Sequence, residues 1–145
     1  MKALLQRVVH AQVHVDGECV GRIEQGLLVF LGLDLNDDKL KADRMLNKLL
    51  AYRMFSDESD RMNNSVADVG GGVLLISQFT LSADTRKGLR PGFSTAMPPA
   101  QALALYDYVL QRLQNLHPKV AAGVFGADMQ VSLTNDGPVT FALEI

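Results

Sequence analysis

Hydrophobic and polar positions alternate along some stretches of the chain and form unbroken apolar runs in others. Residues 3–15 alternate, with small and aliphatic side chains on one face, which predicts a half-buried strand. Asp16-Gly17 predicts a hairpin turn into a second strand over 18–24. The apolar run 27–33, and the run that opens 73–81, predict strands buried on both faces.

Two segments have the apolar spacing of amphipathic helices. The first follows the potential caps Asn36, Asp37 and Asp38, and we expect it to end near Tyr52. The second begins at Pro98-Pro99 and stops before Pro118. Its predicted buried stripe consists of Leu103, Tyr106, Val109, Leu110, Leu113 and Leu116.

The C-terminal part alternates again. Residues 129–134 and 139–145 predict two antiparallel strands joined by a turn at Asn135-Asp136-Gly137-Pro138. Short strands are predicted near 53–55 and over 120–125. The whole chain, residues 1–145, is therefore predicted to be one α/β domain with about seven strands and two main helices.

Composition narrows the function classes. With 14 basic and 16 acidic residues the net charge is −2, so contact with nucleic acid would require a local patch. A single cysteine, Cys19, excludes an internal disulfide or a cysteine metal cluster and fits a reducing cytoplasm. No apolar run approaches the roughly 20 residues of a membrane span, and residues 1–15 do not resemble a signal peptide. We expect a cytoplasmic protein without a metal or cofactor.

Candidate chemistry begins where the predicted strand 73–81 becomes polar, at Ser77, Gln78 and Thr80. Polar groups in a core strand must be satisfied or used. Thr80 as a nucleophile needs an adjacent base, and none lies nearby in the sequence. The three histidines are more typical of surface or structural residues.

Three further features have both a structural and a functional interpretation. Arg7 interrupts the apolar face of the first strand, which is costly unless the arginine is paired. Gly137-Pro138 is either part of an ordinary turn or a loop that presents fixed carbonyls. The basic loop Arg86–Gly92 either contacts a phosphate or ribose backbone or is simply solvated. Phe125 and Met129 are core residues on pattern alone.

Two separated motifs together carry a family resemblance. Ser77-Gln78-Phe79-Thr80-Leu81 and Asn135-Asp136-Gly137-Pro138-Val139-Thr140 resemble the two signature motifs of the D-aminoacyl-tRNA deacylases. The N-terminal residues 1–8 and the loop 86–92 are similar to that family as well. The resemblance covers the whole chain and implies mostly antiparallel and mixed sheets in a barrel-like core with two main helices.

The same resemblance implies a homodimer that acts on the 3′ end of aminoacyl-tRNA. The reaction would be hydrolysis of the ester of a D-amino acid, or of glycine mischarged on tRNA(Ala), with L-amino acids rejected. A cis Gly137-Pro138 loop from one subunit would enter the partner's site, and Arg7 would hold that loop. The residues implied to line the catalytic pocket are Ser77, Gln78, Phe79 and Thr80, while Phe125 and Met129 would contact the terminal adenosine.

Catalysis in such a site would be assisted by the free ribose hydroxyl next to the ester, with backbone N–H groups near Phe79 and Thr80 binding the oxyanion. Two other classes remain open on the sequence. One is a conventional ester or amide hydrolase that uses Thr80. The other is a non-catalytic dimeric RNA-binding module.

Overall fold

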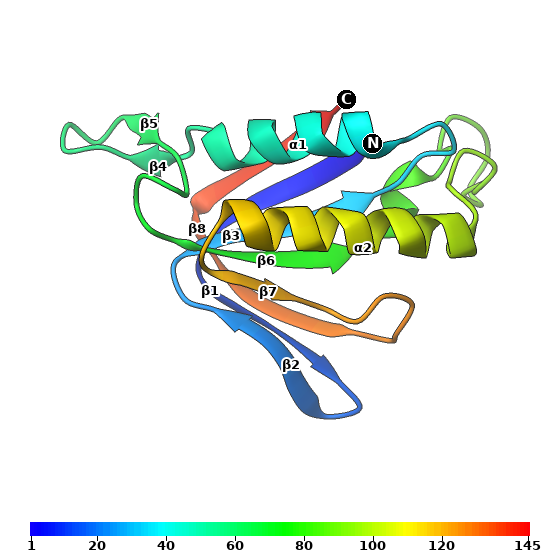
Figure 1. The fold of residues 1–145 in the computed structure, drawn as a ribbon, viewed down its shortest axis with the longest axis horizontal. Coiled ribbons are helices and arrows are strands. Elements are labelled where there is room, and N and C mark those ends of the chain that lie inside the picture. The colour runs from blue at the N-terminus through cyan, green and yellow to red at the C-terminus, as the bar shows by residue number, and fades with distance from the viewer.

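The computed structural model describes all residues 1–145 and combines one curved sheet with two long helices (Figure 1). Along the chain the elements are β1 (Lys2–Val15), β2 (Glu18–Ile23), β3 (Gly26–Gly32), α1 (Lys39–Ala51), β4 (Phe55–Ser56), β5 (Met62–Asn64), β6 (Gly72–Ser77), the 3-10 helix η1 (Phe79–Ser82), α2 (Pro99–Leu116), β7 (Val120–Ala122) and β8 (Gln130–Glu144). The predicted α/β fold with two main helices is confirmed. No helix is long and apolar enough to cross a membrane.

The main sheet has the order β2-β1-β3-β6-β7, and β8 pairs with β1. β1 is antiparallel to β2, β3 and β8, whereas β3, β6 and β7 run parallel to one another. The parallel strands need crossover connections, and these contain α1 and α2. Figure 1 shows both helices side by side over the sheet.

The sheet curls so that its two edges approach each other. A Cβ atom placed on Gly21 of β2 would lie 2.7 Å from the carbonyl oxygen of Ala122 in β7. The larger core cluster lies between the helices and the sheet and includes Leu5, Leu46 and Leu113. A smaller cluster, which includes Val8 and Leu74, fills the inside of the curl. This arrangement is the expected barrel-like core.

The predicted alternation of β1 fails at its middle. Strict alternation through residues 3–15 would bury Val9 with Leu5 and Ala11, but Val9 is 50% exposed, whereas Val8 is fully buried. The pairing of β1 with β8 shifts register on both sides of Val8. A bulge of this kind bends the strand and changes which face a side chain occupies.

The predicted turn between two C-terminal strands is wrong. β8 is one strand that pairs with β1 along its whole length, with Gln6 opposite Thr140 and Val8 opposite Asn135. Five steps along β8, from 140 to 135, therefore correspond to two steps along β1, from 6 to 8. The three additional residues form a bulge at Gly137-Pro138 instead of reversing the chain.

Other predicted boundaries change less. The strand predicted over 73–81 ends at Ser77, because the chain then enters η1. The strand predicted near 53–55 begins only at Phe55, and the one predicted over 120–125 ends at Ala122. In α2, Leu103 and Leu116 are exposed, and the buried stripe consists of Ala102, Leu105, Tyr106, Val109 and Leu113. Asp38 caps α1 by accepting a hydrogen bond from the Lys41 backbone N–H, at 2.8 Å.

A buried carboxylate joins Met1, the residue before β1, to the start of α1. The side chain of Asp37 is fully buried, and its Oδ1 lies 2.8 Å from the Met1 ammonium. Its Oδ2 accepts a hydrogen bond from the Asp34 backbone N–H at 2.7 Å. The Met1 ammonium also donates to the Ile145 carbonyl at 3.1 Å, so this cluster ties β1, β8 and α1 together.

Asp37→Ala is expected to lower the free energy of unfolding by about 2 kcal/mol, because it removes the nearer of the two carboxylates that pair with the buried Met1 ammonium and leaves only Asp34, at 3.1 Å. Urea denaturation followed by circular dichroism measures this loss. Asp43→Ala is the matched control, since it removes a half-buried carboxylate of α1 that pairs with Arg112. Equal losses in the two variants would contradict the importance assigned to the buried pair.

Candidate active site

A pocket of about 740 Å³ lies where β6 ends and α2 begins. This volume is within the range of small-molecule sites. Most of its walls are apolar, and the polar groups come chiefly from the end of β6. The lining residues are Phe30, Ile76, Ser77, Gln78, Phe79, Phe93, Ala96, Met97, Pro98, Pro99, Ala102, Phe125, Gly126, Ala127, Met129 and Val131.

Five of the candidate residues meet in this pocket. Ser77, Gln78 and Phe79 come from the end of β6 and the turn after it, while Phe125 and Met129 come from the segment between β7 and β8. The sequence pattern had placed Phe125 and Met129 in the core, but both are only half-buried. The structure thus combines residues that are about 50 positions apart in the sequence.

The polar floor of the pocket exists because the chain leaves the sheet at Gln78. The Gln78 backbone N–H still donates to the Leu31 carbonyl at 2.8 Å, as if the strand continued. The chain then turns into η1, where the Leu81 N–H donates to the Gln78 carbonyl at 3.2 Å. The first N–H groups of such a turn have no acceptor inside it, and those of Phe79 and Thr80 donate no backbone hydrogen bond.

The opposite wall is held by Tyr106 of α2. Its hydroxyl donates to the Leu75 carbonyl in β6 at 3.1 Å, and its ring centroid lies 5.5 Å from that of Phe125. Burial, and secondarily the charge of Asp107, raises the pKa of Tyr106, so the hydroxyl remains a donor. Tyr106 therefore fixes Phe125 relative to the strand that supplies Ser77.

Thr80 does not line the pocket. Its side chain is exposed, and its Oγ1 accepts a hydrogen bond from Gln78 Nε2 at 2.5 Å. No histidine or carboxylate side chain hydrogen-bonds to it. Of the three histidines, His117 is buried with Nε2 2.8 Å from the Gly71 carbonyl, and the other two lie on β1. The geometry provides no general base for a threonine nucleophile.

Arg7, Gly137 and Pro138 lie elsewhere in the chain. Arg7 is mostly buried and spans two segments: its Nε donates to the Asp136 carbonyl at 3.1 Å and its Nη1 to the Met54 carbonyl at 2.9 Å. Asn135 Nδ2 closes the base of the bulge by donating to the Arg7 and Val139 carbonyls, each at 2.9 Å. Gly137 and Pro138 are exposed, and the peptide bond between them is cis.

The bulge and the pocket are at opposite ends of the molecule. Met54 follows the C-terminal end of α1, whereas Pro98 and Pro99 of the pocket are at the start of α2. In Figure 1 both helices run in the same direction, so these two ends are separated by roughly the length of the helices. A single chain therefore does not bring Gly137 to its own pocket.

Several pocket residues had no signal in the sequence. Phe30 is part of the continuous apolar run of β3, where nothing distinguishes it from a core residue. Phe93 is different, since it follows the basic loop directly and 41% of its surface is exposed. An aromatic residue next to a glycine-rich basic segment was a usable signal for a binding surface.

The model of the D-Tyr-tRNA(Tyr) deacylase family matches residues 4–144. The chain belongs to this family. It is similar to a protein named D-aminoacyl-tRNA deacylase from Stutzerimonas stutzeri strain A1501, with 62% identity over 144 residues and 99% of both chains covered. It is also similar to the protein of that name from Pseudomonas putida strain W619, with 61% identity and full coverage of both.

Solved structures agree on the fold. One is described as a c-Myc DNA unwinding element binding protein and matches with a TM-score of 0.96 and 42% identity, covering 100% of this chain and 99% of that one. A second, described as a probable eukaryotic D-amino acid tRNA deacylase, matches with a TM-score of 0.87. Its identity is only 16% over 99% of this chain and 98% of that one, so it supports the fold alone.

Proposed function

We propose that this protein hydrolyses the ester between a D-amino acid and the 3′-terminal adenosine of tRNA, in a site completed by a second copy of the chain. The family match and the full-length identity of about 60% to D-aminoacyl-tRNA deacylases support the ester hydrolase activity. Glycine mischarged on tRNA(Ala) is included in the proposed substrates, because glycine has no side chain for a chirality filter to reject.

The position of the Gly137-Pro138 bulge is the observation that supports a composite site. The bulge is exposed, anchored by Arg7 and remote from the pocket of its own chain. A homodimer in which each bulge enters the partner's pocket would join the two sets of candidate residues. A symmetric dimer of this kind repeats the same contact twice and closes on itself.

Such a site would select configuration with backbone groups instead of a side-chain pocket. The enzyme must accept many side chains yet reject one arrangement around Cα. Carbonyl groups of Gly137 and Pro138 placed against Cα would clash with the side chain of an L-amino acid, whereas a D side chain would point into open space. A steric clash discriminates without requiring any contact to the accepted side chain.

The proposed reaction uses water and the substrate's own ribose. Water attacks the ester carbonyl carbon, and the oxyanion that forms is bound by the N–H groups of Phe79 and Thr80. Collapse of the tetrahedral species breaks the bond to the ribose oxygen, which takes up the proton released by the water. The neighbouring ribose hydroxyl positions the water, while Phe125 and Met129 hold the adenosine and Ser77 and Gln78 line the floor.

The direct test is deacylation of matched D-tyrosyl-tRNA and L-tyrosyl-tRNA, with the products identified. We expect release of D-tyrosine and intact tRNA, with the L ester left unreacted. Equal rates on the two esters, or no turnover of either, would contradict the proposal. Turnover of an unrelated ester or amide alone would favour the conventional hydrolase, and binding of nucleic acid without turnover would favour the non-catalytic module.

Thr80→Val is expected to retain deacylation within about tenfold, because the hydroxyl is outside the pocket while the backbone N–H is kept. Loss of a true nucleophile would reduce kcat about 10⁴-fold or more. Single-turnover rates on D-tyrosyl-tRNA distinguish these outcomes. Thr80→Ser, which keeps a hydroxyl, is the control, and a Val variant that is inactive while folded would restore Thr80 as a chemical participant.

A further inference from the structure

Two exposed aromatic rings stand at the edge of the pocket. Phe79 is 61% exposed and Phe93 is 41% exposed, although large apolar side chains are usually covered. Their ring centroids are 5.0 Å apart with an interplanar angle of 53°. Both rings also line the pocket. They therefore form an open aromatic surface that continues from the pocket into solvent.

The basic loop projects from the same edge. Its base is closed by two backbone hydrogen bonds between Asp84 and Gly92, at 2.7 and 3.1 Å, which places it directly before Phe93. Arg86 is held by Asp84 through hydrogen bonds of 2.9 and 2.8 Å, and this pairing lowers the pKa of the Asp84 carboxyl. Arg86 is thus neutralised within the loop.

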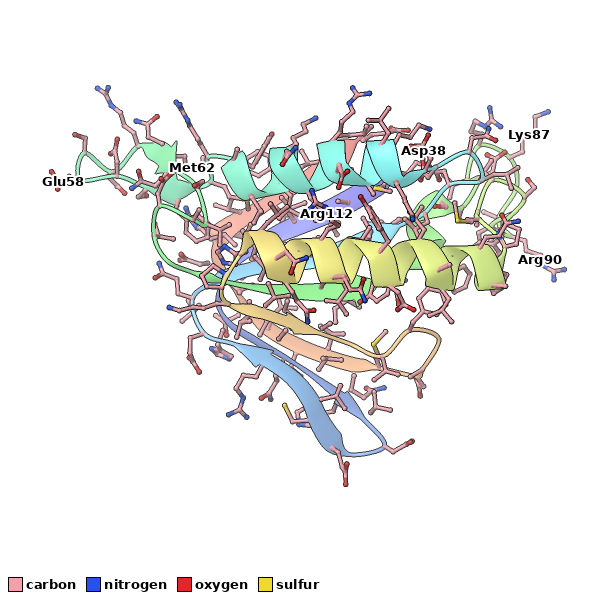
Figure 2. The ribbon with its side chains drawn as sticks, viewed as in Figure 1. Asp38, Glu58, Met62, Lys87, Arg90 and Arg112 are labelled. Atoms are coloured by element: carbon pink, nitrogen blue, oxygen red, sulfur yellow. The ribbon has the colours of Figure 1, made fainter.

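Lys87 and Arg90 are the remaining cations of the loop. Both are exposed, and neither has an ion-pair partner. Figure 2 shows them extending from the end of the molecule at which α2 begins, which is the end that contains the pocket. Two unpaired cations next to two exposed rings give this edge a positive charge that the protein as a whole, at −2, does not have.

We propose that this edge binds the single-stranded RNA segment that precedes the esterified terminal adenosine. Phe93, supported by Phe79, would stack on a base, and Lys87 and Arg90 would contact the phosphates on either side of it. Sites for single-stranded RNA combine aromatic platforms with cations that follow the backbone in this way. The inference rests on the proposed function, because the pocket must hold the terminal adenosine for the preceding nucleotides to reach this edge.

The test compares two D-tyrosyl esters, one of adenosine alone and one of the tetranucleotide ACCA, which retains the phosphates. We expect the double variant Lys87→Gln/Arg90→Gln to raise KM for the tetranucleotide ester about tenfold and to leave the adenosine ester unaffected. For this variant, the slope of log KM against the logarithm of the salt concentration should be smaller than that of the wild type by about 1.4, which is about 0.7 for each lost phosphate contact to a single strand. Phe93→Leu should raise KM for the tetranucleotide ester about fivefold or more.

Arg44→Gln/Lys48→Gln is the matched control, because it removes the same charge from exposed positions of α1. Binding of the unesterified tetranucleotide, measured by fluorescence anisotropy, tests RNA binding at this edge independently of turnover. Equal effects of the two double variants on this binding, or no effect of either, would overturn the inference. Failure of the wild type to hydrolyse either ester would instead contradict the proposed function.

Discussion

Gly137→Ala is expected to lower kcat/KM for D-tyrosyl-tRNA about 100-fold, the size of effect that a displacement of about 1 Å in a positioning group can produce. Gly137 has φ +126°, which side chains rarely adopt. A Cβ there would lie 2.9 Å from Arg7 Nη2 and 2.8 Å from Val139 Cγ2. The methyl group must therefore displace either the arginine or the bulge itself.

Gly17→Ala is the control for backbone strain without displacement. Gly17 has φ +83° in the β1–β2 turn, and nothing lies within 4 Å of its added Cβ. Each variant should lose about 1 kcal/mol of stability from the unfavourable φ, and Gly137→Ala should lose more because its Cβ also displaces a neighbour, but only Gly137→Ala should lose activity. If the two variants deacylate D-tyrosyl-tRNA equally well, Gly137 has no role in the site.

Mixed dimers test whether the bulge acts in the partner's pocket. Met129→Trp should fill the pocket without touching the bulge of its own chain. In a dimer of one Gly137→Ala subunit and one Met129→Trp subunit, a composite arrangement leaves one site with both defects and one with none. We expect such dimers to regain about half of wild-type activity, since one of the two symmetric sites is intact. Inactive mixed dimers would show that each bulge serves its own chain.

The C-terminal strand shows why sequence reasoning failed at the most informative position. Asp136-Gly137 between two alternating segments has the local pattern of a hairpin turn. The outcome was decided by β1, which is long enough to pair with residues on both sides of the bulge. The residues around a turn signal do not show how long a distant partner strand is. A hairpin turn and a bulge therefore could not be distinguished from this local pattern.

Five of the residues predicted for the site line one pocket. Ser77 and Gln78 were identified because polar residues continued an apolar strand, Phe79 was added by the family resemblance, and all three line the pocket. The family resemblance supplied Phe125 and Met129, which pattern alone assigned to the core. That Thr80 lies outside the pocket follows from the end of β6 at Ser77, since η1 rotates the next side chains out of the strand's alternation.

Arg7→Lys is expected to lower kcat/KM for D-tyrosyl-tRNA about 30-fold, because lysine keeps the charge but loses the fork that reaches two carbonyls. The guanidinium uses separate nitrogens for the Asp136 carbonyl and the Met54 carbonyl, and so ties the bulge to the segment after α1. A single ammonium on a flexible stem fixes only one of them. Because the arginine acts through the bulge, the loss should appear with D-tyrosyl-tRNA and be accompanied by weaker rejection of L-tyrosyl-tRNA.

Asp136→Asn separates charge from position at the same contact. The Asp136 carboxylate lies 3.1 Å from Arg7 Nε but is 44% exposed, so this ion pair contributes little. The asparagine retains the backbone carbonyl to which Arg7 donates, and we expect its rates on both esters to be within about twofold of wild type. If Asp136→Asn were as defective as Arg7→Lys, the ion pair and not the carbonyl clamp would hold the bulge. If both variants kept full activity and selectivity, the bulge would not need Arg7.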